Sequence, residues 1–373
     1  MIVTTNTKLG RYEIRSKIGA GGMGEVYLTE DTQLHRKVAL KILPSDLAAN
    51  QDRMRRFNQE ATAAAALNHP NVAHIYEIGQ CDDVNFIAME YVEGQTLRQL
   101  LARRKLDIKR TAELAAQVAS GLSAAHQAGI VHRDIKPENL IVTASGPIKI
   151  LDFGLAKLVE KQRGAAGVSE LTTAHMHPSG QAETVKGAIL GTVAYMSPEQ
   201  ARAEKLDQRT DIFSLGVVLY EMVTGERPFR GKSAIDTLHA IINVEPPPVT
   251  QLNPQLPPEL GDILAKALAK DPAERYQHAG DFELDLRRFK RALETSSLIS
   301  AQMQHVVTPS RTNTRQIGMW VIIGIAVVLG LIIAVWAGRS LNRARTSSWS
   351  TERTVCHATD KLRRGGGFGR TIS

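Results

Sequence analysis

The sequence HRDIKPEN at residues 132–139, followed by DFG at residues 152–154, decides how the rest of the chain is interpreted. Asp134 is a carboxylate that can orient an attacking hydroxyl and accept its proton. Lys136 lies two residues further on, so in an extended loop its cation can reach the same point and neutralise a phosphate. This combination of an acid and a cation predicts a site for phosphate chemistry.

Two hard oxygen donors accompany that pair. Asn139 and Asp152 carry the amide and carboxylate oxygens that Mg²⁺ prefers, and a loop followed by a strand turn would bring them to Asp134. Together the two motifs resemble the catalytic loop and the metal-binding turn of the protein kinases. The resemblance covers about residues 11–290 and is strongest to the bacterial Hanks-type serine/threonine kinases. It implies an α+β, bilobal fold with a small β-rich N-terminal lobe and a larger, mainly helical C-terminal lobe.

The resemblance also implies an activity. A kinase of this type transfers the γ-phosphate of ATP to Ser and Thr hydroxyls of protein substrates, with Mg²⁺ as the metal and Mn²⁺ as a possible substitute. Asp134 and Lys136 would act at the hydroxyl and the γ-phosphate, while Asn139 and Asp152 would hold the metal. Positioning and charge neutralisation supply the catalysis, so no covalent enzyme intermediate is needed.

A glycine-rich segment, GAGGMG at residues 19–24, lies between two predicted strands, residues 12–18 and 25–28. The G-x-G-x-x-G pattern also occurs in Rossmann dinucleotide sites, but there the glycines open a helix, whereas here β-branched and aromatic residues predict a hairpin. A glycine-rich hairpin without a ligand is the alternative. The ATP contacts that the resemblance implies in this segment are Gly19, Gly21 and Gly24.

The predicted strand at residues 38–41 ends in a single lysine, Lys41. Most lysines at strand ends are merely solvated. The resemblance instead makes Lys41 a contact for the α- and β-phosphates of ATP, held by a glutamate of the next helix. That helix is predicted over residues 52–67 because of its strong helix formers, and Glu60 in its middle is the candidate partner.

Residues 86–94 resemble the last strand of the small lobe running into the hinge between the lobes. By resemblance Met89 is the gatekeeper, and the Glu90 carbonyl and the Val92 amide bond to adenine. Apolar side chains would enclose the ring, although each of them alone would more often be plain core. The apolar residues assigned to this slot are Ile18, Val26, Ala39 and Ile141.

Residues 160–186 are rich in small and polar residues without periodicity, which predicts a mobile activation loop. In the resembling family the arginine before the catalytic aspartate, here Arg133, receives a phosphate from this loop. Thr192 resembles the residue that bonds the catalytic aspartate and lysine in Ser/Thr-specific kinases. Inert loop threonines are the alternative to phosphorylation sites. The phosphorylation candidates are Thr184 first, then Thr172 and Thr173.

Three further residues are expected to support the large lobe. Asp211 opens a strongly apolar helix and is expected to tie down the backbone of the catalytic loop. Arg275 matches the family arginine that pairs with a buried glutamate, which is Glu199 here. Both roles are structural and not chemical.

The net charge of +8 raises the possibility of nucleic-acid binding, but its distribution excludes that interpretation. Residues 1–300 carry 36 basic and 36 acidic residues, and residues 301–373 carry 10 basic and 2 acidic ones. The excess belongs to a tail. Cys81 and Cys356 are far apart, so no disulfide framework or zinc site is expected, and the bulk of the chain is assigned to a reducing compartment.

Residues 317–337 contain no charge, and at about 1.5 Å per residue a helix of that length spans roughly 31 Å, which matches a bilayer core. Trp320 and Trp336 lie near its ends, as in an aromatic belt. More arginines follow the segment than precede it, which would place the C-terminus inside. A kinase domain needs cytosolic ATP and is hard to export, so we expect a single-pass cell-membrane protein with a cytoplasmic kinase domain.

The expected organisation is an N-terminal extension (1–10), a kinase domain (11–290), a flexible juxtamembrane linker (291–316), the membrane helix (317–337) and a short basic tail (338–373). An inactive kinase-like scaffold and a membrane adaptor are the rival functions. Small residues at four-residue spacing indicate a possible homodimer face, with lipid-facing filler as the alternative. They are Gly330, Ala334 and Gly338.

Overall fold

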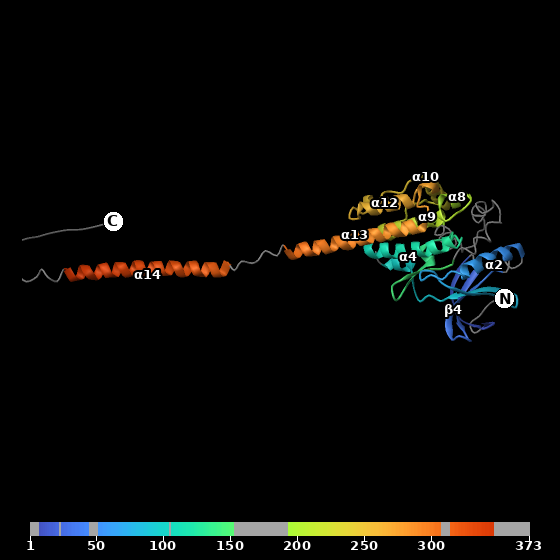
Figure 1. Ribbon diagram of the computed structural model, residues 1–373, viewed down its shortest axis with the longest axis horizontal. Coiled ribbons are helices and arrows are strands. Elements are labelled where there is room, and N and C mark those ends of the chain that lie inside the picture. Colours follow the sequence, from blue (N-terminus) through green and yellow to red (C-terminus); the bar gives the residue numbers. More distant parts are fainter. Residues whose placement is uncertain are drawn as a thin grey trace, which may run out of the picture. The chain divides into compact units, whose positions relative to one another are not determined.

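The computed structural model describes residues 7–21, 24–44, 51–103, 106–152, 193–306 and 314–346 of the chain. The chain divides into two units, Met1–Ser300 and Ala301–Ser373, and each is treated by itself. Among the described residues, the first unit contains all of the strands and every helix except α14 and the end of α13 (Figure 1).

The N-terminal lobe is a six-stranded antiparallel sheet in the order β1-β2-β3-β4-β6-β5, with one helix, α2, packed against β5. Strands β2 and β3 form the hairpin that the glycine-rich segment predicted. Gly24 must be glycine, because its φ is +114° and a Cβ atom there would lie 2.0 Å from the carbonyl oxygen of Ile42. The elements are β1 (Lys8–Leu9), β2 (Tyr12–Gly21), β3 (Gly24–Asp31), β4 (Arg36–Ile42), α2 (Gln51–Ala65), β5 (Ile75–Cys81) and β6 (Val84–Glu90).

Strand β4 shows how residue alternation positions the site. Val38 and Leu40 are buried in a small cluster on one face of the sheet. Ala39 belongs to the large core on the other face, together with Phe57 of α2. Because side chains alternate along a strand, Lys41 shares the face of Ala39. The predicted phosphate contact therefore points toward the rest of the domain.

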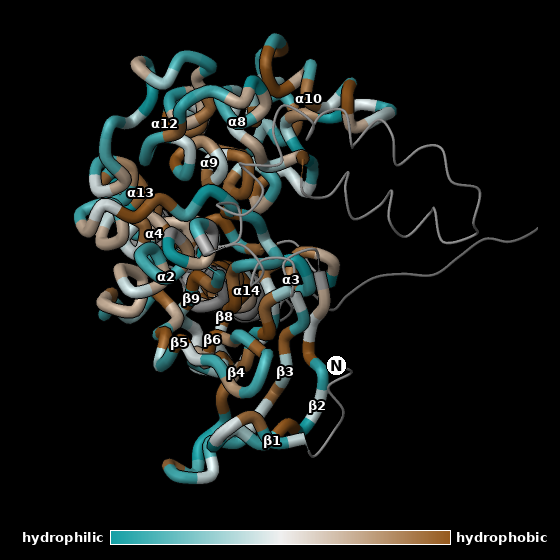
Figure 2. Tube along the Cα trace, turned by 90° about the vertical axis from the view of Figure 1, so that its right-hand side faces the viewer, coloured by the Kyte–Doolittle hydropathy of each residue, from teal (hydrophilic) through white to brown (hydrophobic). Residues whose placement is uncertain are grey.

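The C-terminal lobe is mainly helical, with a three-stranded sheet beside the catalytic loop. In Figure 2 the strands of the N-terminal lobe and the helices α8, α10 and α12 occupy opposite ends of the domain. The predicted division into a β-rich N-terminal lobe and a mainly helical C-terminal lobe is confirmed. The elements are β7 (Gly94–Thr96), α3 (Leu97–Arg103), α4 (Ile108–Gln127), η1 (Pro137–Asn139), β8 (Leu140–Thr143), β9 (Ile148–Ile150), α8 (Pro198–Ala201), α9 (Arg209–Thr224), α10 (Ala234–Asn243), α11 (Val249–Leu252), α12 (Pro258–Ala267), η2 (Pro272–Glu274) and α13 (Ala279–Val306).

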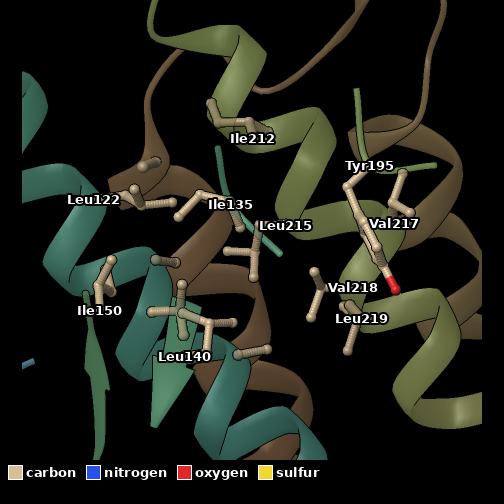
Figure 3. Packing of buried hydrophobic residues seen from close by; sticks show 14 of the residues in the cluster. Leu122, Ile135, Leu140, Ile150, Tyr195, Ile212, Leu215, Val217, Val218 and Leu219 are labelled. Carbon is tan, nitrogen blue, oxygen red and sulfur yellow. The ribbon is translucent and has the colours of Figure 1, made fainter. Parts of the chain in front are cut away.

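Helix α9 is the centre of this lobe. Thirteen of its residues, Thr210–Met222, are buried on all sides of the helix, and it packs against α4, α11 and α12. Figure 3 shows Ile135 of the catalytic loop among Leu122 of α4 and Ile212 and Leu215 of α9. One residue of the loop is thus anchored in the core, so its neighbours Asp134 and Lys136 are held at the surface of that core.

A buried ion pair joins α8 to the segment after α12. The Arg275 guanidinium donates from Nη1 to Glu199 Oε1 at 2.8 Å and from Nη2 to Oε2 at 2.9 Å. Thr210 adds a hydrogen bond of 2.7 Å to the same carboxylate. The predicted pairing of Glu199 with Arg275 is confirmed. Burial by itself would raise the pKa of Glu199, but these donors hold it below its ordinary value.

The expected flexible linker differs from the structure. Helix α13 continues to Val306, so the first part of residues 291–316 is helical, and α14 (Thr314–Thr346) includes the last three residues of that range. Ala, Leu, Glu, Gln and Met are frequent between residues 292 and 304, and these are strong helix formers. The abundance of polar residues indicated a linker, but it did not exclude a helix.

Helix α14 is the main described element of the second unit. Within it Met319–Ala337 is long and apolar enough to cross a membrane, with a mean hydropathy of 2.8 and none of the stretch buried. Its large apolar side chains, including Trp320 and Trp336, are exposed.

We expect Glu199→Gln to lower the free energy of unfolding by about 3–5 kcal/mol, because it leaves the Arg275 charge buried without its partner. Loss of this carboxylate also removes a pH dependence. In the folded protein the pKa of Glu199 lies below its ordinary value of 4.5. The stability that this carboxylate contributes is therefore fully present above pH 4.5 and is lost as the pH falls through the lowered pKa. Urea denaturation across acid pH would measure both effects.

The control is Arg287→Ala, which removes an exposed pair with Glu283 on α13 and should cost no more than about 1 kcal/mol. A Glu199→Gln protein as stable as this control would contradict a supporting role for the buried pair.

Candidate active site

The backbone of the catalytic loop is held by one carboxylate, as the sequence predicted for Asp211. Its Oδ2 accepts hydrogen bonds from the His132 amide at 2.7 Å and from His126 Nε2 at 2.8 Å, and its Oδ1 accepts one from the Arg133 amide at 2.7 Å. Asp211 is fully buried, and burial by itself would raise its pKa. The hydrogen bonds from His126 and from the backbone amide of His132 nevertheless hold the pKa of Asp211 below its ordinary value.

The loop has a strained residue at its centre. Arg133 has a φ of +66°, in the left-handed region that residues with a side chain rarely adopt. Its amide is fixed by Asp211, and its carbonyl accepts a 2.7 Å hydrogen bond from Gln200 Nε2 of α8. Bonds on both sides of the residue therefore maintain this conformation, which turns the next residue, Asp134, toward the site.

His132 links the catalytic loop to the strand that precedes the metal turn. Its Nδ1 accepts from the Asp134 amide at 3.2 Å, so its Nε2 carries the proton and donates to the Leu151 carbonyl at 2.8 Å. Burial lowers the pKa of His132, so the ring is neutral, as this pair of bonds requires. The sequence interpretation assigned no role to His132. Its place in the motif, two residues before Asp134, was the only signal.

The three polar residues of the loop converge. Lys136 Nζ lies 2.7 Å from Asp134 Oδ2, so the acid and the cation predicted to act together are in contact. Asn139 Nδ2 donates to the Asp134 carbonyl at 2.8 Å and to Asp134 Oδ2 at 3.0 Å. Because Asn139 uses its NH₂ group in these bonds, its side-chain oxygen is directed elsewhere and is available as a hard ligand for a cation.

Lys41 and Asp152 form the second group. Lys41 Nζ lies 3.0 Å from Asp152 Oδ1, and the lysine side chain is buried while Asp152 is partly exposed. Asp152 also has a positive φ, +51°. The predicted phosphate contact and the predicted metal ligand are therefore adjacent.

The expected pairing of Lys41 with Glu60 stays a prediction. In the structure Glu60 Oε2 lies 3.6 Å from Nη1 of Arg133, and Lys41 Nζ lies 3.0 Å from Asp152 Oδ1. A buried cation needs a carboxylate close to it, and Asp152 meets that need for Lys41. The sequence pattern does not give the distances that decide between these ion pairs.

The predicted adenine slot draws on both sheets. Val26 lies opposite Lys41 in the register of β3 and β4, Ala39 lies opposite Met89, and Ile141 is in β8. Ala39, Met89 and Val92 are buried, whereas Ile18 is exposed, at 46%. Gly19 and Gly21 are in β2, opposite Val26 and Gly24 respectively.

At the hinge, the amide of Glu90 donates to the carbonyl of His74 at 2.8 Å, and its carboxylate pairs with Lys149 at 2.9 Å. These bonds fix the backbone and the side chain of Glu90 at the hinge. The adenine contacts of the Glu90 carbonyl and the Val92 amide stay predictions. The remaining predicted positions lie outside the described residues: Thr172, Thr173, Thr184 and Thr192.

Comparison with known proteins identifies the family to which these motifs belong. The protein kinase domain family matches residues 12–281. The serine/threonine-protein kinase PrkC of Bacillus subtilis is 42% identical over 279 residues, which are 74% of this chain and 40% of that protein. The serine/threonine-protein kinase PknB of Mycobacterium tuberculosis is 39% identical over 292 residues, 77% of this chain and 44% of that protein. The chain thus spans about two-fifths of the length of these curated relatives.

A solved structure shares the architecture. The crystal structure of the Mycobacterium tuberculosis PknI kinase domain aligns with a TM-score of 0.58 at 26% identity, covering 77% of this chain and 99% of that one. The family match includes the catalytic loop, the metal turn and the glycine-rich hairpin. The chain therefore belongs to the protein kinase domain family.

Proposed function

We propose that this chain is an active serine/threonine protein kinase that transfers the γ-phosphate of ATP to protein hydroxyls. The observation that carries the proposal is the contact of Asp134 with Lys136 at 2.7 Å, beside the contact of Lys41 with Asp152 at 3.0 Å. An acid for the hydroxyl, two cations for phosphates and oxygen donors for a metal are all present. Relatives named as serine/threonine-protein kinases support the same activity.

Asp134 is the group that would receive the acceptor hydroxyl. The buried carboxylate is fixed by Lys136 and by Asn139 Nδ2, so it can orient a hydroxyl without first reorganising. Lys136 is placed to neutralise negative charge on the phosphoryl group in transfer, and Lys41 is placed to hold the other phosphates.

The residues present fit a divalent metal of the Mg²⁺ type. Asn139 and Asp152 offer hard oxygens, and Mg²⁺ is usually held by one or two protein groups together with substrate phosphates and water. Within the described residues no cluster of three or more His, Cys, Asp or Glu could form an all-protein cage. When bound, the metal would supply charge neutralisation between the phosphates. Mn²⁺ could take the same ligands.

The organisation proposed for the chain has a cytoplasmic kinase domain, residues 11–290, flanked by residues 1–10. A single membrane crossing within residues 317–337, a connecting segment at 291–316 and the tail at 338–373 complete it. The exposed apolar helix Met319–Ala337 supports the crossing. The need for cytosolic ATP supports the orientation.

Two rivals remain open to test. An inactive scaffold of the same fold would bind partners without transferring phosphate, and a membrane adaptor would use the tail and the connecting segment. The presence of Asp134, Lys41 and Asp152 together favours the enzyme over the scaffold. An adaptor role is compatible with catalysis.

Replacing Asp134 by Asn should leave ATP binding nearly intact and reduce turnover at least about a hundredfold, because the hydroxyl loses its proton acceptor. Lys41→Met should also cripple turnover, and Asp152→Asn should weaken the use of nucleotide with Mg²⁺. Radiolabelled ATP with a generic protein substrate would measure transfer, and fluorescent nucleotide would measure binding.

The control is Glu283→Gln, which removes a carboxylate on α13. Near-normal turnover by Asp134→Asn would contradict the assigned role. No transfer by the unmodified protein, with either Mg²⁺ or Mn²⁺, would refute the enzyme and favour the scaffold.

Activation is proposed to proceed by autophosphorylation at Thr184, with Thr172 and Thr173 as second choices. A phosphothreonine carries about −1.5 to −2 charges. A phosphate on this loop would compete with Glu60 for Arg133 and thereby allow Glu60 to approach Lys41.

Mass spectrometry of the active enzyme should find phosphate at Thr184. Arg133→Ala should abolish most of the activity gained on phosphorylation. A fully active enzyme without phosphate anywhere in residues 160–192 would refute this route.

Tethering in a membrane raises the effective concentration of one kinase around another, which favours phosphorylation between molecules. A homodimer is proposed through Gly330, Ala334 and Gly338, which share one face of α14. Gly330→Ile with Ala334→Ile should reduce helix self-association in a membrane reporter and slow autophosphorylation.

The matched control is Val328→Ala with Ile332→Ala, at the same spacing on the opposite face of the helix. Equal self-association of the wild type and the Gly330→Ile, Ala334→Ile variant would show that the face with the small residues is only lipid-facing.

A further inference from the structure

A network of charged side chains surrounds the aromatic ring of Tyr195 beside the catalytic loop. Arg98 of α3 donates from Nε to Glu138 Oε1 at 2.8 Å and from Nη1 to Glu221 Oε1 at 2.8 Å. Its Nη2 also bonds the hydroxyl of Tyr195. That hydroxyl donates to the second oxygen of Glu221 at 2.6 Å. One arginine therefore joins two carboxylates from different elements.

The network adjoins the catalytic loop. Glu138 is in the catalytic loop, between Lys136 and Asn139, and its side chain is 44% exposed. Tyr195 lies three residues after Thr192 in the sequence. A hydroxyl presented to Asp134 belongs to a peptide whose neighbouring residues extend over the surface next to the loop. These residues would meet Glu138 and Arg98.

The charges of the network cancel. Glu138 and Glu221 contribute two negative charges, while Arg98 and Arg227, 3.8 Å from Glu221, contribute two positive ones. Glu221 is only 10% exposed, so it needs a cation close to it. The side chain of Arg98, which bonds both carboxylates, remains 29% exposed.

Arg98 and Tyr195 are held firmly in this arrangement. Burial opposes the charge on Arg98, but the hydrogen bonds to Glu138 and Glu221 keep its pKa above the ordinary value. Burial and the charge of Glu221 raise the pKa of the Tyr195 hydroxyl, so it remains protonated and continues to donate. The site is therefore preassembled, with the chain's own cation in it.

We propose that Arg98 is a specificity-determining residue that fills the acidic pair Glu138–Glu221 with an internal cation. The pair would otherwise attract a basic side chain from the substrate. Because Arg98 already satisfies it, the kinase accepts acceptor peptides whose flanking residues are neutral or acidic and gains nothing from a flanking arginine. The inference rests on the proposed kinase function and names the class of substrate that the site takes.

A purely structural role for Arg98 makes a different prediction. If Arg98 only fixes α3 against the catalytic loop, its loss should lower stability and turnover on all peptides equally. If it determines specificity, its loss should change the ranking of peptides. The ranking therefore separates the two roles, whatever the overall loss of activity.

The test uses the full chain in lipid nanodiscs and a peptide set with one acceptor threonine, in which arginine or alanine stands at each flanking position in turn. The wild type should show less than about a twofold preference for arginine. Arg98→Met, which keeps an unbranched apolar side chain at this position, should prefer arginine about fivefold or more in kcat/KM at one flanking position, since a partly desolvated ion pair becomes available to the substrate. Adding Glu138→Gln should remove most of that gain, and Arg98→Lys should restore the flat profile.

A second variant covers the case in which Arg98→Met does not fold. Glu138→Gln alone changes an exposed side chain and leaves the network with an excess positive charge, so it should favour aspartate over alanine at the same position. Arg287→Met, which removes an exposed arginine of α13, should leave the profile flat.

The outcomes are distinct. A flat profile in both Arg98→Met and Glu138→Gln, or an arginine preference already present in the wild type, would overturn the inference. A wild type that phosphorylates no peptide would instead overturn the kinase function itself.

Discussion

The buried carboxylate of Asp211 is the interaction on which the catalytic loop depends. It accepts two backbone amides of the loop and the ring of His126, so three donors converge on one residue. Because α9 is buried on all sides, the carboxylate cannot turn toward water. The backbone at Arg133 is held in the left-handed region by these bonds, and the position of Asp134 follows from that conformation. The large apolar helix is thus the base on which a polar site is built.

Two ion pairs connect the N-terminal lobe to the C-terminal lobe at the candidate active site. Lys41 of the N-terminal sheet is bound to Asp152, and Glu60 of α2 is bound to Arg133 of the catalytic loop. Each pair joins an element of the small lobe to one of the large lobe. The relative position of the lobes is therefore coupled to which carboxylate each cation selects, and this choice is what a phosphate, a metal or a modified residue would change.

Residue patterns predicted the fold and the contact between Asp134 and Lys136, because both follow from local sequence. Alternation along β4 places Lys41 on the inner face, and the position of Gly24 follows from a close backbone approach that only glycine allows. The partner of Glu60 was not predictable in the same way. An ion pair across two lobes depends on distances of a few ångström, and several acidic residues satisfy the sequence pattern equally well.

The helix that continues to Val306 was not predicted, because the polar composition of residues 291–316 was taken to indicate a linker. The residues of this helix are nevertheless good helix formers. The role of Arg98 is visible only when three distant segments meet around Tyr195.

If Lys41 and Asp152 have the roles proposed for them, their contact would make the binding of metal and nucleotide mutually dependent. The carboxylate of Asp152 is neutralised by a lysine 3.0 Å away, so a metal ion alone would have to displace an ammonium group before it gained this ligand. Phosphate groups that drew Lys41 toward themselves would leave Asp152 accessible to a cation. By thermodynamic reciprocity each ligand would then raise the affinity of the other by the same factor. The lysine would thereby act as an internal competitor that disfavours occupation of the site by either ligand alone.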